Sequence, residues 1–282
     1  MALDDFVEVA WLAARLDDPR LRIVDARSVP HGGVVAMPSG AEQYAAGHLP
    51  GAVHLDYGED LSDPATPYAT RVAGEADFAR VMGAHGIGDD ALVVAYDAGT
   101  VPFAARIVWM LRYYGFANAA VLAGGLPAWT AAGMPLSTDP PPIVPAVFTP
   151  RRLDGLRATR EEVLAIAEGR EDAQLLETQR DQTYAQRDRD IQGAVRVSGN
   201  LLLEDARGGR PASEETLQRL VREAGLDPHK RTVVSCGSGV SASGAWLALQ
   251  RAGFDDIAVY DGSWMEWSHD ALPTVPKRAG ST

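Results

Sequence analysis

The sequence has a single cysteine, Cys236, among its 282 residues. One cysteine excludes an intrachain disulfide, and with it the class of small secreted domains that disulfides hold together. The sequence also lacks any apolar run that approaches the roughly 18 residues a membrane span needs. Residues 1–20 are acidic early and helix-like, which fits neither a secretory signal nor an Arg-rich transit peptide. We therefore expect a cytoplasmic protein.

Positive charge is also scarce in this chain. Lys and Arg together number 26 against 38 Asp and Glu, which gives a net charge of -12 and a pI near 4.9. A chain of this charge is not expected to bind nucleic acid or an anionic membrane. An anionic small substrate would therefore need a local positive site that works against the field of the whole protein.

The two halves of the chain repeat one plan. Residues 115–129 and 253–267 have equal length and share Gly, Phe, Val, Gly and Trp at matching places, 138 positions apart. Three further pairs of segments recur in the same order: LRIVDARS with QLLETQRD, HLPGAVHL with DIQGAVRV, and ALVVAYDAG with RTVVSCGSG. Four matches in one order indicate a duplication, in line with a length that suggests about two domains.

A proline-rich segment separates the two halves. Residues 137–150 read STDPPPIVPAVFTP and hold five prolines in 14 residues. Proline at this density gives a stiff, extended connection that neither a helix nor an inner strand can use. We predict three parts of the chain: a first domain at 1–138, a linker at 139–150 and a second domain at 151–282.

Short apolar runs alternate with helical patterns in both halves. The predicted strands are LRIVDA, AVHLD, ALVVAY and AAVLAG in the first half and LLET, AVRVS, TVVSC and IAVYD in the second. This alternation predicts an α/β fold in which each domain is a mostly parallel sheet with helices on both faces. Ligands of such sheets bind at the carboxyl ends of the strands, and Cys236 stands at one of these ends.

The surroundings of Cys236 favour chemistry over packing. A lone cysteine is often a small buried apolar residue, but this one leaves a strand and enters the Gly-Ser-Gly turn at 237–239. Glycines allow successive backbone N–H groups to converge on an anion, and the helix predicted at 241–254 presents its positive end there. Ser238 or Ser241 is predicted to cap that helix. We expect a lowered thiol pKa and a nucleophilic Cys236 with no acidic side chain beside it.

Other uses of this loop fit less well. A cysteine phosphatase needs an arginine six positions after its nucleophile, and this chain has Ala242 there. No lysine follows the glycines, as a phosphate-binding loop requires, and Ser243 breaks the G-x-S-x-G pattern of esterases. A papain-like Cys–His pair stays open on spacing alone, although the surrounding signature is absent. One cysteine and scattered histidines give no zinc site, so no metal is expected. A thiolate held by backbone donors suits attack on a sulfur atom.

These motifs resemble a known family. Residues 236–241, CGSGVS, resemble the C-G-S-G-V-T loop of the 3-mercaptopyruvate sulfurtransferases, whereas the thiosulfate branch has charged residues after its cysteine. HLPGAV, YDAG, GGLPAW and YDGSWMEW also match, so nearly the whole chain resembles the tandem rhodanese-domain sulfurtransferases.

The resemblance implies a reaction in two halves. Cys236 takes a sulfane sulfur from 3-mercaptopyruvate or thiosulfate and passes it from a persulfide to cyanide, a small thiol or a protein thiol such as thioredoxin. It implies no metal and no organic cofactor. The matching loop of the first domain, YDAG at 96–99, has no thiol, so that domain is expected to be non-catalytic.

The resemblance also implies roles for individual residues. Ser238 matches a serine, and His48 a histidine, of a proposed Ser–His–Asp relay; the segment before His48 offers only Glu42 for the acid. The active loop would bind substrate through its remaining residues: Gly237, Gly239, Val240 and Ser241.

An arginine is expected to clamp the donor carboxylate. Arg187 aligns with one of the family's arginines in this region, with Arg180 or Arg189 as substitutes, whereas Gln179 and Thr183 stand where the family has others. This loss of arginines keeps two alternatives open: a thiosulfate-preferring enzyme, or a sulfur-binding or regulatory rhodanese-like protein with weak or lost turnover. Trp264 and Trp267, near the C-terminus, are expected to pack in the core.

Overall fold

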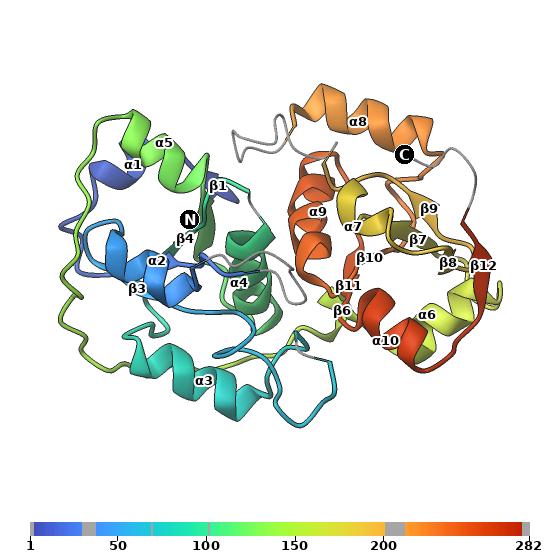
Figure 1. Ribbon diagram of the computed structural model, residues 1–282, viewed down its shortest axis with the longest axis horizontal. Helices are drawn as coiled ribbons and strands as arrows, with labels where there is room; N and C mark the ends of the chain where they lie inside the picture. The colour runs from blue at the N-terminus through green and yellow to red at the C-terminus, as the bar shows by residue number, and fades with distance from the viewer. Residues whose placement is uncertain (1–2, 30–37, 69, 101, 201–211, 278–282) are drawn as a thin grey trace. The chain divides into compact units, whose positions relative to one another are not determined.

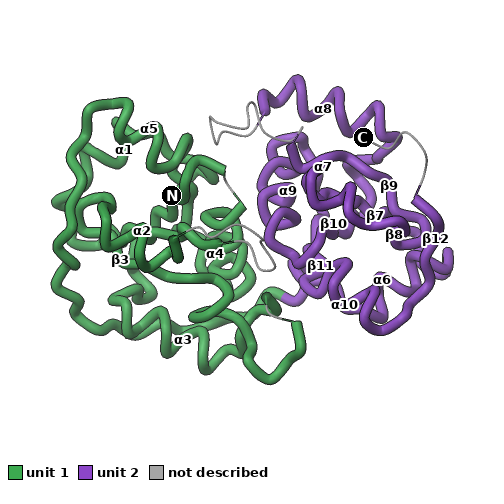
Figure 2. Tube along the Cα trace, viewed as in Figure 1, with its two compact units in different colours: residues 1–153, 207–210 green, residues 154–206, 211–282 purple. Residues whose placement is uncertain are grey.

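The computed structural model describes residues 3–29, 38–68, 70–100, 102–200 and 212–277 (Figure 1). Within this part of the chain there are two compact units, the first ending at Leu153 and the second beginning at Asp154 (Figure 2). The predicted linker, 139–150, contains neither helix nor strand. It is hydrogen-bonded to the first unit, for example from the Ala146 N–H to the Gly83 carbonyl at 3.0 Å, so the division falls just after it.

The first unit is built on a five-stranded sheet whose paired strands are all parallel, in the order β1-β5-β4-β2-β3. Its strands are β1 (Phe6–Val7), β2 (Leu21–Asp25), β3 (Ala52–His54), β4 (Leu92–Tyr96) and β5 (Ala119–Leu122). Its helices are α1 (Val9–Ala13), α2 (Gly40–Ala46), α3 (Glu75–Ala84), α4 (Pro102–Tyr113) and α5 (Gly125–Ala131).

The second unit repeats this sheet in the order β6-β11-β10-β7-β9, again with parallel pairs. Its strands are β6 (Arg157–Ala158), β7 (Gln174–Glu177), β9 (Val195–Arg196), β10 (Thr232–Ser235) and β11 (Ile257–Tyr260). A separate antiparallel pair joins β8 (Arg189–Ile191) to β12 (Thr274–Pro276). Its helices are α6 (Arg160–Ala167), α7 (Asp181–Tyr184), α8 (Glu214–Glu223), α9 (Val240–Arg251) and α10 (Ser263–His269), after a short 3-10 turn, η1 (Asp154–Leu156).

Helices cover both faces of the second sheet (Figure 1). On one face, apolar side chains of α6 and α10 pack against β10 and β11, and Trp267 is fully buried among them. On the other face, α9 packs against β10 and β11, and α8 packs on α9. Trp267 donates its indole N–H to the Pro273 carbonyl at 2.9 Å, as Trp129 does to Pro135 at 2.8 Å in the first unit. The duplication therefore extends to the hydrogen bond of a core tryptophan.

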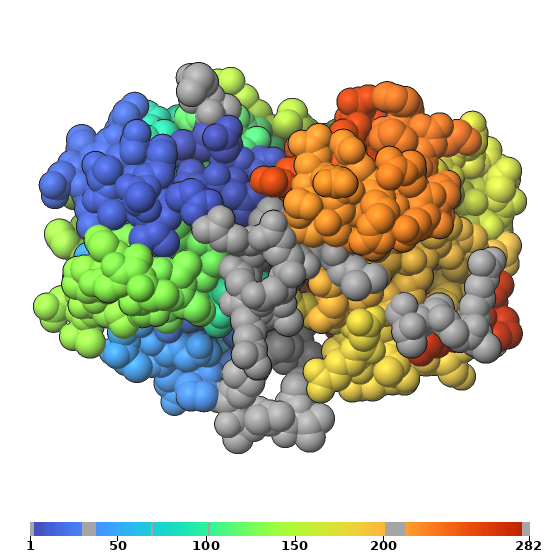
Figure 3. Space-filling view, turned by 90° about the horizontal axis from the view of Figure 1, so that it is seen from above, coloured from blue at the N-terminus to red at the C-terminus, as the bar shows by residue number. Residues whose placement is uncertain are grey.

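Helix α8 is amphipathic, with one side buried in the domain and the other exposed. Leu217 and Val221, one turn apart, are its buried residues, while Arg219 and Glu223 form an exposed ion pair at 3.1 Å on its outer side. Figure 3 shows this helix, in orange, forming part of the surface of the second unit. In the part of the chain that the structure describes, no helix is long and apolar enough to cross a membrane.

The predicted α/β fold, with parallel sheets flanked by helices, is confirmed, and each predicted strand has a counterpart within a few residues. One local prediction was wrong. The helix after Cys236 begins at Val240 with Gly239 as its N-cap, and no side chain caps it, so neither Ser238 nor Ser241 has that role. The glycine, in the left-handed region at a φ of 80°, makes the sharp turn that a serine cap would not allow.

Candidate functional site

Cys236 follows the last residue of β10 and is almost completely buried, with 2% of its surface exposed. Its backbone N–H donates to Ser263 Oγ at 3.1 Å, and its carbonyl accepts from the Trp264 N–H at 3.0 Å. The next carbonyl, of Gly237, accepts from the Met265 N–H at 2.9 Å. The first turn of α10 therefore fixes the backbone of the loop on one side.

The sulfur of Cys236 lies in a cradle of backbone donors. The N–H groups of Ser238, Gly239 and Ala242 act as backbone donors toward this sulfur and lower its pKa. These groups come from the turn and from the start of α9, so the helix end and the loop amides converge on one atom. Such a cradle stabilises an anionic sulfur, whether a thiolate or a persulfide.

The pKa of the Cys236 thiol is nevertheless raised, and the prediction of a lowered value was wrong. Burial is the largest cause, because the thiolate loses its hydration, and the carboxylate of Glu177 adds to it. The three backbone donors act in the opposite direction without overcoming these two effects. The expectation that no acidic side chain lies near Cys236 was wrong as well.

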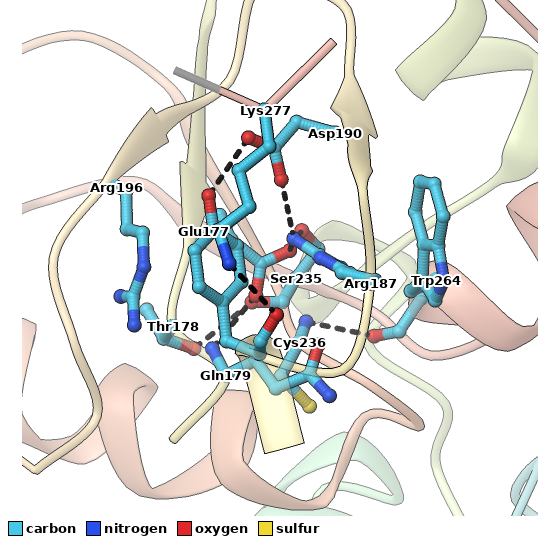
Figure 4. Close-up of polar contacts among 12 residues, drawn as sticks. Glu177, Thr178, Gln179, Arg187, Asp190, Arg196, Ser235, Cys236, Trp264 and Lys277 are labelled. Atoms are coloured by element: carbon cyan, nitrogen blue, oxygen red, sulfur yellow. Dashed lines mark hydrogen bonds and ion pairs between the residues drawn. The ribbon is translucent and has the colours of Figure 1, made fainter. Parts of the chain in front are cut away.

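Glu177 is the last residue of β7 and pairs in register with Ser235 on β10, directly before Cys236. Its side chain is buried, and burial raises its pKa against the opposing effect of Arg187. The carboxylate accepts from the Gln179 N–H at 2.7 Å and contacts Arg187 Nη2 at 2.7 Å. A buried acid thus lies at the strand end next to the cysteine (Figure 4).

Arg187, which was predicted to bind the donor carboxylate, instead forms ion pairs with two carboxylates of the protein. Its Nη2 lies 2.7 Å from Glu177 Oε2 and 2.9 Å from Asp190 Oδ1, and its side chain is only 6% exposed. The guanidinium also lies over the rings of Tyr184 and Trp264, at 4.6 Å from each centroid. Trp264, expected in the core, is half-buried beside this cluster, whereas Trp267 is in the core as expected.

The two substitute arginines lie elsewhere in the second unit. Arg189 is exposed on β8 and donates from Nη2 to the Thr274 carbonyl at 2.9 Å. Arg180 is the N-cap residue of α7 and is half-buried. Neither replaces Arg187 in its contact with Glu177.

Known proteins match this chain along nearly all of its length. The rhodanese-like domain family matches residues 8–132 and 159–270. The thiosulfate sulfurtransferase of Cricetulus griseus is 33% identical over 98% of this chain and 96% of its own. The 3-mercaptopyruvate sulfurtransferase of Escherichia coli K12 is 32% identical over 96% and 98%. The crystal structure of SseA from Escherichia coli, of the 3-mercaptopyruvate sulfotransferases, superimposes with a TM-score of 0.84 at 30% identity, covering 93% of this chain and 99% of that one.

The chain belongs to the rhodanese family. Two matches in sequence mean that it carries two rhodanese domains, and the structure gives each of them the same sheet order. The predicted resemblance to the tandem sulfurtransferases is thereby confirmed.

The first rhodanese domain has a carboxylate where the second has its thiol. Asp97, after β4, accepts from the Gly99 and Thr100 N–H groups at 2.9 Å each and from the Ala104 N–H at 3.3 Å. The residues of this loop therefore direct backbone donors to an anion that the chain supplies itself. Asp97 is 2% exposed and offers no nucleophilic sulfur.

His48 lies in the first rhodanese domain and is fully buried. Its Nδ1 is 2.9 Å from the Tyr44 carbonyl, its Nε2 is 3.2 Å from the Asp139 carbonyl, and its ring stacks on that of Tyr44 at 3.9 Å. Glu42, the acid available before it, instead forms the capping box of α2 with Ser39. Both ring nitrogens of His48 are thus next to backbone carbonyls, and its relay role stays a prediction.

The remaining predicted site residues follow Cys236 in the loop and at the start of α9. Gly237 has the amide of Gln179 against it: a Cβ at Gly237 would lie 3.2 Å from Gln179 Nε2. Ser238 and Ser241 are half-buried, and Val240 is buried at the start of α9. Within the described residues, no group of three or more His, Cys, Asp or Glu side chains is placed to hold a metal ion.

Sequence reasoning missed two residues of this site, Glu177 and Ser263. A signal for Glu177 was present, because the matching strand-like segment of the first half also contains an acid near its end, Asp25. Parallel strands end at one edge of the sheet, so an acid ending β7 must lie near a cysteine that follows β10. Ser263 had no such signal, since its contact depends on how α10 packs against the loop.

Proposed function

We propose that this protein is a sulfurtransferase in which Cys236 carries the transferred sulfur as a persulfide. The observation that supports this most directly is the cradle of three backbone N–H groups around the Cys236 sulfur. It offers backbone donors to an anionic sulfur, and Ala242 stands where a cysteine phosphatase would need an arginine to hold a phosphoryl group. The membership of both domains in the rhodanese family supports the same reaction.

In the first half-reaction the Cys236 thiolate attacks the transferable sulfur of the donor. With 3-mercaptopyruvate, the new S–S bond forms as the C–S bond breaks, and the carbon takes the electron pair as the enolate of pyruvate. The proton of the donor thiol passes to that enolate, and Cys236 keeps a persulfide anion. With thiosulfate, the S–S bond of the donor breaks and sulfite leaves with the electron pair.

In the second half-reaction an acceptor removes the outer sulfur of the persulfide. Cyanide attacks this sulfur, the Cys236–S bond breaks, and thiocyanate leaves while Cys236 returns to its thiolate. A thiolate acceptor attacks in the same way and becomes a persulfide itself. A protein thiol such as that of thioredoxin is our proposed alternative to cyanide and small thiols, and we retain the cytoplasm as the proposed location.

The donor that we favour is 3-mercaptopyruvate. The active loop, CGSGVS, carries no charged side chain, which matches the mercaptopyruvate branch. Relatives named for thiosulfate and for 3-mercaptopyruvate are about equally similar, so overall similarity does not choose between them. In this proposal Gly237, Gly239, Val240 and Ser241 bind the substrate, Ser238 keeps its proposed relay role, and the first rhodanese domain carries no sulfur.

The test is the mass of the intact protein after incubation with each donor, followed by steady-state rates with cyanide. The expected result is the gain of one sulfur atom, lost on adding cyanide and absent in Cys236→Ser, with pyruvate released from 3-mercaptopyruvate. No gain of sulfur from either donor would sink the proposal.

A second candidate function is a sulfur-binding or regulatory protein with slow turnover. The raised pKa of Cys236 favours it, because less thiolate is present at neutral pH. In that case the protein gains its sulfur but transfers it to cyanide or a thiol no faster than the uncatalysed reaction.

A further inference from the structure

Matching strands of the two rhodanese domains end in different ways. β2 ends at Asp25, and Arg27 folds back so that its Nε lies 2.9 Å from Asp25 Oδ1. β7 ends at Glu177, whose carboxylate accepts from the Gln179 N–H as Asp25 accepts from the Arg27 N–H, so the uncharged Gln179 stands in the place of Arg27. The buried acid of the second domain must therefore find its cation elsewhere, because a buried carboxylate without a partner is strongly disfavoured.

Arg187 supplies that cation. It lies ten positions beyond Glu177, yet its Nη2 is 2.7 Å from Glu177 Oε2, and the two side chains are only 6% and 2% exposed. The same nitrogen holds Asp190 at 2.9 Å. Its Nε and Nη1 are buried atoms without a hydrogen-bond partner among the described residues, so solvent does not reach them.

We propose that Arg187 is a positioning residue that acts through Glu177 and does not contact the sulfur donor. It holds the buried carboxylate next to the sulfur-carrying loop in place, as Arg27 holds Asp25 in the first domain. This inference rests on the proposed function of Cys236, since it concerns how that thiol is set up for reaction.

Glu177 is linked to the loop through the backbone as well as by charge. The Thr178 N–H and Oγ1 donate to the Ser235 carbonyl at 2.8 and 2.9 Å, so the ends of β7 and β10 move together. The Glu177 charge also raises the pKa of the Cys236 thiol. A change at Glu177 should therefore be seen in the reactivity of the sulfur.

Other charged and titratable groups around the Glu177–Arg187 pair come from several elements. Asp190 raises the pKa of Glu177, and the Tyr184 hydroxyl donates to Asp190 Oδ2 at 2.8 Å. The buried Glu266 of α10 lies against Gly262. Two more cations lie over the Tyr184 ring, at 3.8 and 4.3 Å from its centroid: Arg196 and Lys277.

Three variants separate a positioning role from a clamp: E177Q, R187M and the double variant E177Q/R187M. E177Q removes the negative charge near Cys236 and leaves Arg187 in place. R187M leaves a buried acid without its cation, and the double variant replaces the pair by two neutral side chains. R189M, an exposed arginine bonded to Thr274, serves as the matched control.

Two measurements are made on each variant: the pH dependence of Cys236 alkylation by iodoacetamide, and KM with kcat for 3-mercaptopyruvate. We expect E177Q to be alkylated faster than wild type at neutral pH, since loss of the Glu177 charge lowers the thiol pKa and raises the thiolate fraction. We expect R187M to be less stable to heat, and the double variant to regain that stability. KM in the double variant should stay within about twofold of KM in E177Q.

A KM raised about tenfold in E177Q/R187M relative to E177Q would overturn the inference, because Arg187 would then contact the donor. Unchanged alkylation of E177Q would also overturn it. Alkylation needs no sulfur donor, so a protein that reacts with iodoacetamide as expected but accepts no sulfur would disprove the proposed function and leave this inference standing.

Discussion

The backbone N–H of Cys236 donates a hydrogen bond to Ser263 Oγ at 3.1 Å. The Ser263 hydroxyl in turn donates to the Tyr260 carbonyl at 2.7 Å, so one side chain connects the end of β11 to the residue that carries the sulfur. Ser263 is fully buried and has a φ of 49°, a left-handed conformation that is uncommon outside glycine. Local strain of this kind is maintained where the surrounding structure requires it.

Replacing Ser263 by alanine should alter the position of Cys236, although the cysteine itself is unchanged. Ser263→Ala leaves the buried Cys236 N–H without an acceptor, which should cost about 1–3 kcal/mol of unfolding free energy. We expect sulfur transfer from 3-mercaptopyruvate to fall with it. Thermal unfolding and steady-state rates measure the two effects. Ser263→Gly is the matched control, because it also loses the hydroxyl but relieves the left-handed strain. Full activity in Ser263→Ala would show that this hydrogen bond does not set the position of the sulfur.

Gly239 should be required for its backbone conformation. Its φ of 80° lies at the turn whose N–H groups reach the sulfur, so Gly239→Ala should cost about 1–2 kcal/mol and misalign the donors. Gly253→Ala is the matched control, with a φ of 88° and open space around its Cβ position. Both variants should unfold at lower urea concentration, but only Gly239→Ala should lose sulfur transfer. Equal losses of activity would mean that general destabilisation explains both.

The fold could be read from the sequence because local and repeated signals agree. The strand pattern of IAVY at 257–260 occurs in both halves with the same glycine and tryptophan beyond it, and each copy forms a strand next to the central one. The short strands β1 and β6 were not predicted, because two residues are too few to show an alternating pattern. They exist only because the sheet edge supplies their hydrogen bonds.

The identity of the nucleophile could be inferred, but its electrostatics could not. A cysteine at a strand exit before Gly-Ser-Gly indicates the backbone donors around Cys236. The direction of its pKa depends on how deeply the sulfur is buried and on Glu177, which is 59 positions earlier in the chain. For the same reason Arg187 looked like an exposed clamp, since its two acid partners meet it only in the folded domain.

The raised pKa of Cys236 makes a prediction about stability in alkali. A free thiol titrates near 8.5, and the folded value lies above the unfolded one. Between the two values the unfolded chain has released a proton that the folded chain still holds, so stability is lost as pH rises through this window and is fully present below it. The excess stability of wild type over Cys236→Ala should therefore shrink as pH rises above about 8.5. Urea unfolding of both proteins at several pH values measures this difference in stability. A difference that grows as pH rises would indicate that the Cys236 pKa is lowered.

Asp97 should stabilise the first rhodanese domain without serving sulfur transfer. Its carboxylate accepts from three backbone N–H groups, so Asp97→Ala should cost about 1–2 kcal/mol, as the loss of a helix cap does. Asp97→Asn keeps one acceptor oxygen and should lose less. The quantity to compare is the rate of Cys236 persulfide formation at a temperature where both variants are folded. If persulfide formation were slower in Asp97→Asn and slower still in Asp97→Ala, the loop around Asp97 would contribute to the reaction.

A structural role of His48 can be distinguished from a relay role by replacing it with glutamine, a polar side chain that carries no titratable proton. His48→Gln should lower the unfolding temperature, because the buried ring contacts the Tyr44 and Asp139 carbonyls and stacks on Tyr44. If these contacts are its whole role, the pH profile of sulfur transfer stays that of wild type. Cys236 alkylation should be unchanged too. A relay that passes through His48 requires a different result: kcat for 3-mercaptopyruvate falls by about 10²-fold or more, the range of general acid–base catalysis, and its pH dependence loses the limb of a histidine. Glu42→Gln distinguishes the two further, since this residue caps α2 and should alter stability alone.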